Sequence, residues 1–349
     1  MPAVSIVVPN YNHARFLKKR LDSIFEQSFQ DFELIFLDDA STDQSREVFE
    51  AYESDPRVTA IFNETNSGSP FVQWNKGFSL ARGTYVWLAE SDDFADANFL
   101  QVLVDVLNEN PGAGLAYSQS MYVDKNDKLL GAYTYGLYED HERWDHDFQN
   151  SGQDEVKRYF SISNVIPNAS AVLIRRSVIQ SGVMAPENLR LAGDWQFWIS
   201  VLLRTDLCYV ATPMNYFRIM HDASQRSRSL NDGSEILEGL AVQRFLQSRV
   251  ALSDEELQVI VSRRIRHWMF VHRERKFRIK VNKRIFIEFV NVLSSGSSRS
   301  PLAAKANVGS RAVLYYLLQI PVIKRTFAPI WHWFNKNVRK KSQDKQAVA

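Results

Sequence analysis

The 349-residue sequence contains a single cysteine, Cys208, and no long run of uncharged apolar residues. One cysteine excludes an internal disulfide and a zinc site built from four thiolates. The apolar stretch at 312–323 is interrupted by Pro321 and is shorter than the about 20 residues that cross a bilayer. The apolar run at 4–8 is short and lacks the basic leader of a signal peptide. We therefore expect a folded cytoplasmic protein.

Glycine-rich phosphate loops are also absent from the place where they would be expected. Neither GxGxxG nor GxxxxGK[S/T] follows the first apolar run, where the sequence is PNYNH. A nucleotide would therefore have to be held by other groups.

Charge is distributed unevenly along the chain, although the net charge is only +2. Residues 1–225 contain 18 Lys and Arg against 31 Asp and Glu, whereas residues 226–349 contain 24 against 9. This asymmetry predicts two domains with different tasks, 1–225 and 226–349, and suggests that the second one meets an anionic partner.

Apolar runs and amphipathic segments alternate through the first third of the chain. We expect strands at 4–8, 33–39, 57–62, 84–90 and 114–123, and helices at 14–27, 41–54, 71–81 and 96–109. Such alternation predicts an α/β fold with a mainly parallel sheet flanked by helices, whose ligands bind outside the carboxyl ends of the strands. Residues 124–160 lack a clear period and are expected to form loops near an acceptor.

Acidic residues follow two of these expected strands. Asp38 and Asp39 end the second strand, and Glu90, Asp92 and Asp93 follow the fourth. The first pair suits a nucleoside, but it also suits a helix cap. The second group suits a hard divalent cation, but it could equally be a solvated acidic turn. Together they predict a nucleotide and metal site at one edge of the sheet.

Four segments occur in the order and spacing of a known family: VSIVVPNYN, LIFLDDASTD, NSGSPFVQWNKG and WLAESDD. That family is the family 2 glycosyltransferases, which this chain resembles over roughly residues 3–220. The resemblance implies a GT-A fold and an inverting, metal-dependent transfer from a nucleotide-diphospho-sugar. It also implies Mn²⁺ or Mg²⁺ as the cofactor and favours UDP as the nucleotide.

The same resemblance assigns residues to the donor base and ribose. Pro9 and Tyr11 should flank the base, and Asp39 should contact the uracil ring with Asp38 in the same pocket.

Further assignments concern the sugar diphosphate and the metal. Asn75 and Lys76 match a helix beside the sugar nucleotide. Asp93 is expected to be the direct metal ligand and Asp92 to bind ribose or metal. Glu90 stands where the family often has Asp.

An inverting transfer also needs a carboxylate that takes the proton of the acceptor hydroxyl. By resemblance Asp194 is this general base, although Gly193 stands where the family often has a second acid, and an N-cap role is the alternative for Asp194. Arg218 and His221 match a segment close to the donor diphosphate, with a structural role as the alternative for His221.

The basic C-terminal region combines Lys and Arg with aromatic residues at 263–286 and again at 330–341. Basic helices of this kind suit an anionic membrane surface, here the inner face of the plasma membrane. A helical cap on the catalytic domain and a homodimer contact are the alternatives. No groove-reading motif is present, so we expect no nucleic-acid partner.

We therefore expect an enzyme that transfers a sugar to a hydroxyl of a glycan or lipid-linked acceptor in bacterial surface polysaccharide assembly. The alternatives are a nucleotidyltransferase, which would want a basic glycine-rich loop after the first strand, and an inactive binding or scaffold protein with the same fold.

Overall fold

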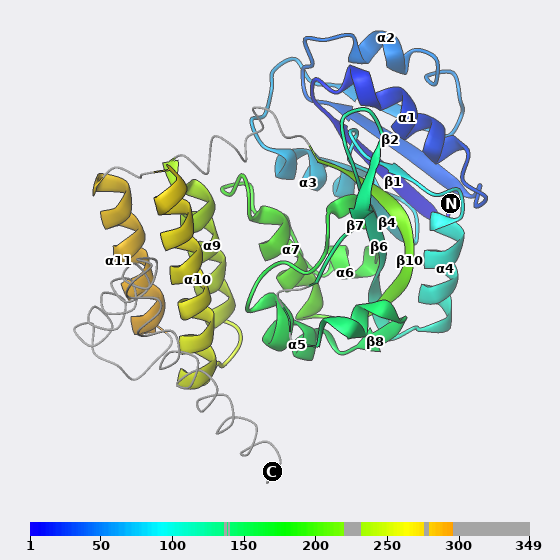
Figure 1. Ribbon diagram of the computed structural model, residues 1–349. Helices are drawn as coiled ribbons and strands as arrows, with labels where there is room; N and C mark the ends of the chain where they lie inside the picture. The colour runs from blue at the N-terminus through cyan, green and yellow to red at the C-terminus, as the bar shows by residue number, and fades with distance from the viewer. Residues whose placement is uncertain (136–137, 139, 220–231, 276–278, 296–349) are drawn as a thin grey trace. The chain divides into compact units, whose positions relative to one another are not determined.

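The computed structural model describes residues 1–135, 138, 140–219, 232–275 and 279–295 (Figure 1). Its contacts divide the chain into two compact units, Met1–Arg228 and Ser229–Ala349.

The first unit is built on a sheet of ten strands, eight of them in the order β3-β2-β1-β4-β9-β6-β10-β5. β7 pairs with β6, and β8 pairs with β10. The strands are β1 (Val4–Asn10), β2 (Phe32–Asp38), β3 (Val58–Phe62), β4 (Tyr85–Leu88), β5 (Phe94–Ala95), β6 (Ala113–Val123), β7 (Leu129–Ala132), β8 (Phe148–Asn150), β9 (Val172–Arg175) and β10 (Asp206–Arg218).

Helices cover both faces of this sheet because its central strands are apolar on both sides. Ile6 and Val8 belong to a core that includes residues of α1, α2 and α4, whereas Val7 points to the other face and packs against Gly77 of α3. Figure 1 shows α1 beside α2. The helices of this unit are α1 (Ala14–Phe25), α2 (Ser45–Phe49), α3 (Pro70–Leu80), α4 (Phe99–Glu109), α5 (Gly152–Glu155), α6 (Arg176–Gln180) and α7 (Gly193–Leu202). Two 3-10 turns, η1 (His141–Asp145) and η3 (Ala169–Ala171), and a π-helical turn, η2 (Val156–Phe160), complete the list.

The α/β class is confirmed, but the sheet is less parallel than the alternation predicts. β1, β2, β3 and β4 pair in parallel, as does β6 with β10. β9 lies antiparallel between β4 and β6. Because β9 runs opposite to β4, it begins at the edge of the sheet where β4 ends. The residues before β9 therefore reach the same edge as the acidic loop after β4.

The helix expected at 41–54 was wrong in length, since α2 covers only Ser45–Phe49. The preceding polar residues are engaged in loop contacts instead. The Ser41 hydroxyl donates to Asp38, the Thr42 N–H donates to Asn12, and Asp43 accepts hydrogen bonds from Ser45 and Ala14.

The segment at 124–160, expected to be loops near an acceptor, is divided between the two ends of β10. Its first turn contacts Arg218 at the end of β10 through Asp124 and Asp127. β8, by contrast, pairs with Leu207–Tyr209 at the beginning of β10. Of the described residues in this segment, those of the first turn lie beside the acidic loop.

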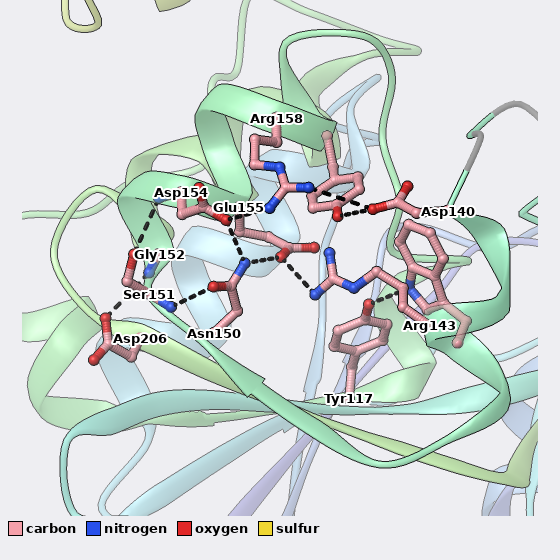
Figure 2. Close-up of polar contacts among 12 residues, drawn as sticks. Tyr117, Asp140, Arg143, Asn150, Ser151, Gly152, Asp154, Glu155, Arg158 and Asp206 are labelled. Carbon is pink, nitrogen blue, oxygen red and sulfur yellow. Dashed lines mark hydrogen bonds and ion pairs between the residues drawn. The ribbon is translucent and has the colours of Figure 1, made fainter. Parts of the chain in front are cut away.

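A buried ion pair anchors the far part of this segment (Figure 2). Glu155 is fully buried and accepts hydrogen bonds from Arg143 at 3.0 Å and from Asn150 at 2.7 Å. The Arg143 guanidinium lies 3.8 Å from the Phe148 ring centroid and 4.2 Å from that of Tyr159. These contacts hold the insertion together, and the Trp144 indole N–H, which donates to the Tyr117 hydroxyl at 3.0 Å, ties it to β6.

The described part of the second unit is helical, as expected. It consists of α9 (Ser234–Gln247), α10 (Asp254–Arg275) and α11 (Ile279–Ser295), which share an apolar core around Leu240, Ile265 and Phe289. Within the described residues, no helix is both long enough and apolar enough to cross a membrane. The linker expected at 294–300 lies largely outside the described residues, and the aromatic group at 330–341 lies wholly outside them.

Candidate active site

Three loops meet at the edge of the sheet where β1, β2 and β4 end. β1 lies between the other two strands and runs parallel to both. The Asn10 amide donates to Asp38 at 2.8 Å, and His13 Nδ1 lies 2.9 Å from Ser91 Oγ. These bonds tie the end of β1 to the end of β2, and the loop after β1 to the loop after β4. The two acidic clusters therefore lie at one edge, where α/β sheets bind their ligands.

Asp38 stabilises the loop that follows it. The residue is 4% exposed, and its carboxylate accepts hydrogen bonds from the Ser41 hydroxyl at 2.6 Å and the Ser41 N–H at 2.9 Å, besides the Asn10 amide.

Asp39 forms hydrogen bonds to the segment between β3 and α3 and to α3 itself. Its carboxylate accepts from the Asn63 amide at 2.7 Å, the Gln73 amide at 2.8 Å, and the Ser67 hydroxyl and N–H at 2.7 and 3.0 Å. It is also only 4% exposed. To make the expected contact with a uracil, the Asp39 carboxylate would therefore have to give up one of these internal hydrogen bonds.

Asn75 and Lys76 of α3 have partners within the protein. The Asn75 amide donates to the Ala185 carbonyl and to Glu187, each at 2.9 Å, and accepts from the Ala185 N–H. Lys76 Nζ donates to the Asn63 side-chain oxygen at 2.6 Å. Asn75 thus holds the chain at 185–187 against α3, a contact that the sequence pattern does not reveal.

Asp93 is a buried hydrogen-bond acceptor at the centre of the acidic loop. It is 2% exposed; its Oδ2 accepts from the Asn168 amide and the Ser170 hydroxyl, and its Oδ1 accepts from the Arg218 N–H at 2.9 Å. Burial raises the pKa of Asp93 to about 7, and the neighbouring Asp92 adds to the rise.

Glu90 is held inside the protein by α3. Part of the residue is exposed, but its carboxyl group is enclosed and accepts from the Trp74 indole N–H at 2.8 Å. Burial, together with the charge of Asp92, raises the pKa of Glu90 to about 8. The Glu side chain, one methylene longer than the Asp that the resemblance often places here, reaches this indole.

Asp92 is the most open of the three acids. Its side chain is half-buried, and its carboxylate has no hydrogen-bond partner among the described residues. Nor do those residues contain three His, Cys, Asp or Glu side chains grouped to hold a metal ion. Oxygen donors such as Asp92 fit Mg²⁺ or Mn²⁺, which proteins often bind through one or two carboxylates and the phosphates of the substrate.

Arg20 of α1 supplies the positive charge behind this loop, and sequence reasoning did not single it out. It is fully buried, donates from Nε to the Glu90 carbonyl at 2.8 Å, and has no described hydrogen-bond partner at its two terminal nitrogens. Burial lowers its pKa to about 10, while Asp93, Asp92 and Glu90 oppose the shift. The guanidinium therefore stays charged and offsets the mutual repulsion of the acids.

Arg218 forms part of the same framework. Its guanidinium donates to the Asp92 and Asp124 carbonyls at 2.7 and 2.6 Å and pairs with Asp127, and its side chain is 1% exposed. It orders the loops around the acids, so the expected contact with a diphosphate would require these bonds to rearrange. His221 lies outside the described residues.

Pro9 and Tyr11, expected to flank the base, differ in exposure. Pro9 is buried within β1, whereas Tyr11 is 45% exposed in the loop after it. Of the two, Tyr11 is the one with an exposed ring.

Asp194 lies in the first turn of α7, half-buried and oriented by Asn164, whose amide donates to Oδ2 at 2.9 Å. Its Oδ1 accepts from the Trp195 N–H at 2.7 Å. A Cβ added at Gly193 would lie 2.3 Å from Phe71 Cε2. The Phe71 ring thus occupies the space that a second acidic side chain would need, and Asp194 is the only acid in this pair of positions.

Other contributors to the site that sequence reasoning missed are His13, Asn164, Asn168 and Ser170. Each acts through a contact with a residue at least 30 positions away. The nearest sequence signal was a polar residue beside an apolar segment, as at Ser170 before β9.

Comparison with known proteins agrees with this geometry. Residues 5–181 match the family description Glycosyl transferase family 2. TuaG of Bacillus subtilis, whose name assigns it to teichuronic acid biosynthesis, is 27% identical over 212 residues, covering 60% of this chain and 75% of TuaG. Glycosyltransferase GlyG of Streptococcus pneumoniae is 32% identical over 106 residues, covering 30% of this chain and 35% of GlyG.

Among solved structures, S. aureus TarS 1–349 in complex with UDP-GlcNAc superposes with a TM-score of 0.69 at 18% identity, covering 90% of this chain and 89% of that one. A longer TarS structure is covered over 54% of its length. At this identity the likeness shows the fold.

The chain belongs to glycosyltransferase family 2 and has the GT-A fold. It is therefore an enzyme of the glycosyltransferase class, and membership of this family removes the nucleotidyltransferase alternative.

Proposed function

We propose that the protein catalyses an inverting transfer of a sugar from a nucleotide-diphospho-sugar, with UDP as the favoured nucleotide, to a hydroxyl group. The observation that carries this proposal is the meeting of the loops after β1, β2 and β4, where the half-buried carboxylate of Asp92 has no hydrogen-bond partner among the described residues. Asp194, in the first turn of α7, adds a second half-buried carboxylate. A TarS structure in complex with UDP supports the nucleotide.

The donor would lie along the edge formed by the three loops. The base would lie by Tyr11 and Asp39, with Pro9 and Asp38 supporting its pocket, while Asn75, Lys76, Arg218 and His221 stay predictions for the sugar diphosphate. The geometry favours Asp92 as the direct metal ligand, because Asp93 is buried and already accepts three hydrogen bonds. We infer that Asp93, through these hydrogen bonds, holds the neighbouring Asp92 in position.

A divalent ion held by Asp92 and the diphosphate would neutralise the charge that develops on the leaving group. Asp194 takes the proton of the acceptor hydroxyl while the oxygen of that hydroxyl attacks the anomeric carbon of the sugar. The bond between the anomeric carbon and the diphosphate breaks at the same time. Asn164 orients the carboxylate for this step through its hydrogen bond to Oδ2.

The acceptor that we propose is a glycan or a lipid-linked sugar of bacterial surface polysaccharide assembly. The name of TuaG supports this class. The basic residues of 226–349 support attachment to the inner face of the plasma membrane. In the described part of this region, Arg266 and Phe270 are exposed on α10. Salt-dependent cosedimentation of the full chain with anionic vesicles tests this attachment; a homodimer contact would appear instead as self-association without vesicles.

Replacing Asp194 by Asn tests the catalytic assignment. Loss of the base should lower nucleotide release by about 10²–10⁴-fold while nucleotide affinity and melting temperature stay close to those of the wild type. Asp154→Asn, an acid in the first turn of α5, serves as the matched control.

The measurement is nucleotide release from a panel of nucleotide sugars with Mn²⁺ and candidate acceptors, followed by NMR of the anomeric configuration of the product. A fully active Asp194→Asn protein would contradict the assignment of the base, and retained configuration would contradict inversion. A wild-type chain that binds donors but never turns over would support the scaffold alternative.

A further inference from the structure

His13 occupies the meeting point of the three loops, and neither the family resemblance nor the catalytic scheme above gives it a role. It directly precedes α1, in the turn after β1. Its Nδ1 lies 2.9 Å from the hydroxyl of Ser91, which is 1% exposed and stands between Glu90 and Asp92. The imidazole is therefore attached to the middle of the acidic loop.

The turn that carries His13 is fixed on its other side as well. Asn12 adopts a left-handed conformation with φ of 57°, its N–H donates to Ser41 at 2.9 Å, and its side-chain oxygen accepts from the Thr42 N–H at 2.7 Å. The N–H of Ala14 donates to Asp43 at 2.9 Å. His13 is thus held between two loops by hydrogen bonds and is only partly exposed.

The second ring nitrogen has no such partner. His13 Nε2 makes no hydrogen bond among the described residues, and Ser91 Oγ has only His13 as its partner there. If the Ser91 hydroxyl donates to Nδ1, then Nε2 carries the ring proton and is a hydrogen-bond donor. A donor beside an acidic loop is useful to an anionic ligand, which the carboxylates alone would repel.

We propose that His13 binds the diphosphate of the nucleotide-sugar donor through Nε2, with Ser91 holding the ring in place. This inference rests on the proposed function, since it deepens the donor site. His13 is here a binding residue for the diphosphate and not an acid or base of the transfer.

His13→Asn separates the two contacts of the imidazole. The Asn side chain places an amide atom where Nδ1 was and can keep the contact with Ser91, but it has nothing at the position of Nε2. The exposed His146 offers a matched His146→Asn control. Calorimetric titration should use whichever of UDP, GDP and dTDP the wild type binds with Mn²⁺, together with the corresponding monophosphate.

We expect His13→Asn to weaken binding of the nucleoside diphosphate about tenfold, which corresponds to about 1.4 kcal/mol. Binding of the monophosphate and the melting temperature should match those of the wild type and of His146→Asn. Equal diphosphate affinity in wild type and His13→Asn would overturn the role of His13 alone. Failure of the wild type to bind any of the three diphosphates would overturn the proposed donor class as well.

Discussion

The contact between Gly193 and Phe71 explains why the expected acidic pair is reduced to Asp194, and it gives a quantitative test. An added methyl group at Gly193 would lie 2.3, 2.5 and 2.7 Å from three carbons of the Phe71 ring, whereas carbon atoms prefer about 3.5–4.0 Å. The ring is 3% exposed and packs edge-on against Trp74, with ring centroids 5.0 Å apart. It therefore has little room to move away.

Gly193→Ala should destabilise the first unit by about 1–3 kcal/mol, the usual cost of overpacking a filled core. For a domain of this size each kcal/mol lowers the melting temperature by about 2–4 °C. Adding Phe71→Leu should recover part of the loss, so that the two changes together cost at least about 1 kcal/mol less than their sum. Because Asp194 follows Gly193, nucleotide release should fall as well.

Gly112→Ala is the matched control, because an added Cβ there meets nothing within 4 Å. Urea unfolding of the four variants, including the double mutant, measures both stability and coupling. If Gly193→Ala unfolds at the same urea concentration as Gly112→Ala, or if its cost is independent of Phe71, then the ring does not fill this space and our explanation of the missing acid is wrong.

Two further predictions concern the acidic loop. Burial raises the pKa values of Glu90 to about 8 and of Asp93 to about 7, so the folded chain keeps protons that the unfolded chain releases near pH 4. Without a divalent ion, stability should therefore fall as the pH rises from 5 to 8. Asp93→Asn should flatten this dependence in urea unfolding; a wild-type stability that rises over this range would contradict the assigned shifts. Arg20→Met, which removes the buried cation and its bond to Glu90, should cost about 3 kcal/mol. Lys18→Met on the exposed side of α1 should cost less than about 1 kcal/mol, and equal melting temperatures would show that Arg20 does not balance the acids.

The general plan of the fold followed from local pattern, because the apolar runs and their spacing specify strands and helices directly. The placement of Asp38 and Asp93 at one edge also followed, since β2 and β4 both pair in parallel with β1. The antiparallel course of β9 did not follow, because a four-residue strand carries no signal of its direction.

The supporting contacts of the site were beyond sequence pattern for a related reason. Arg20 stands at a position where an amphipathic helix could equally face solvent, and only the packing of α1 shows that it is buried. Asn164 and Asn168 reach Asp194 and Asp93 across 30 and 75 positions. Such pairings depend on the tertiary arrangement and not on the local sequence.

The central claim is that the edge formed by β1, β2 and β4 holds a nucleoside diphosphate with a divalent ion at Asp92. Calorimetric titration of the wild type, Asp92→Asn and the exposed control Asp105→Asn with UDP, GDP and dTDP, in Mn²⁺ and in EDTA, tests this claim most directly. The account predicts that the wild type and Asp105→Asn bind one of these nucleotides more tightly with Mn²⁺, and that Asp92→Asn loses this dependence. Mn²⁺-dependent binding of equal strength in all three proteins would contradict it.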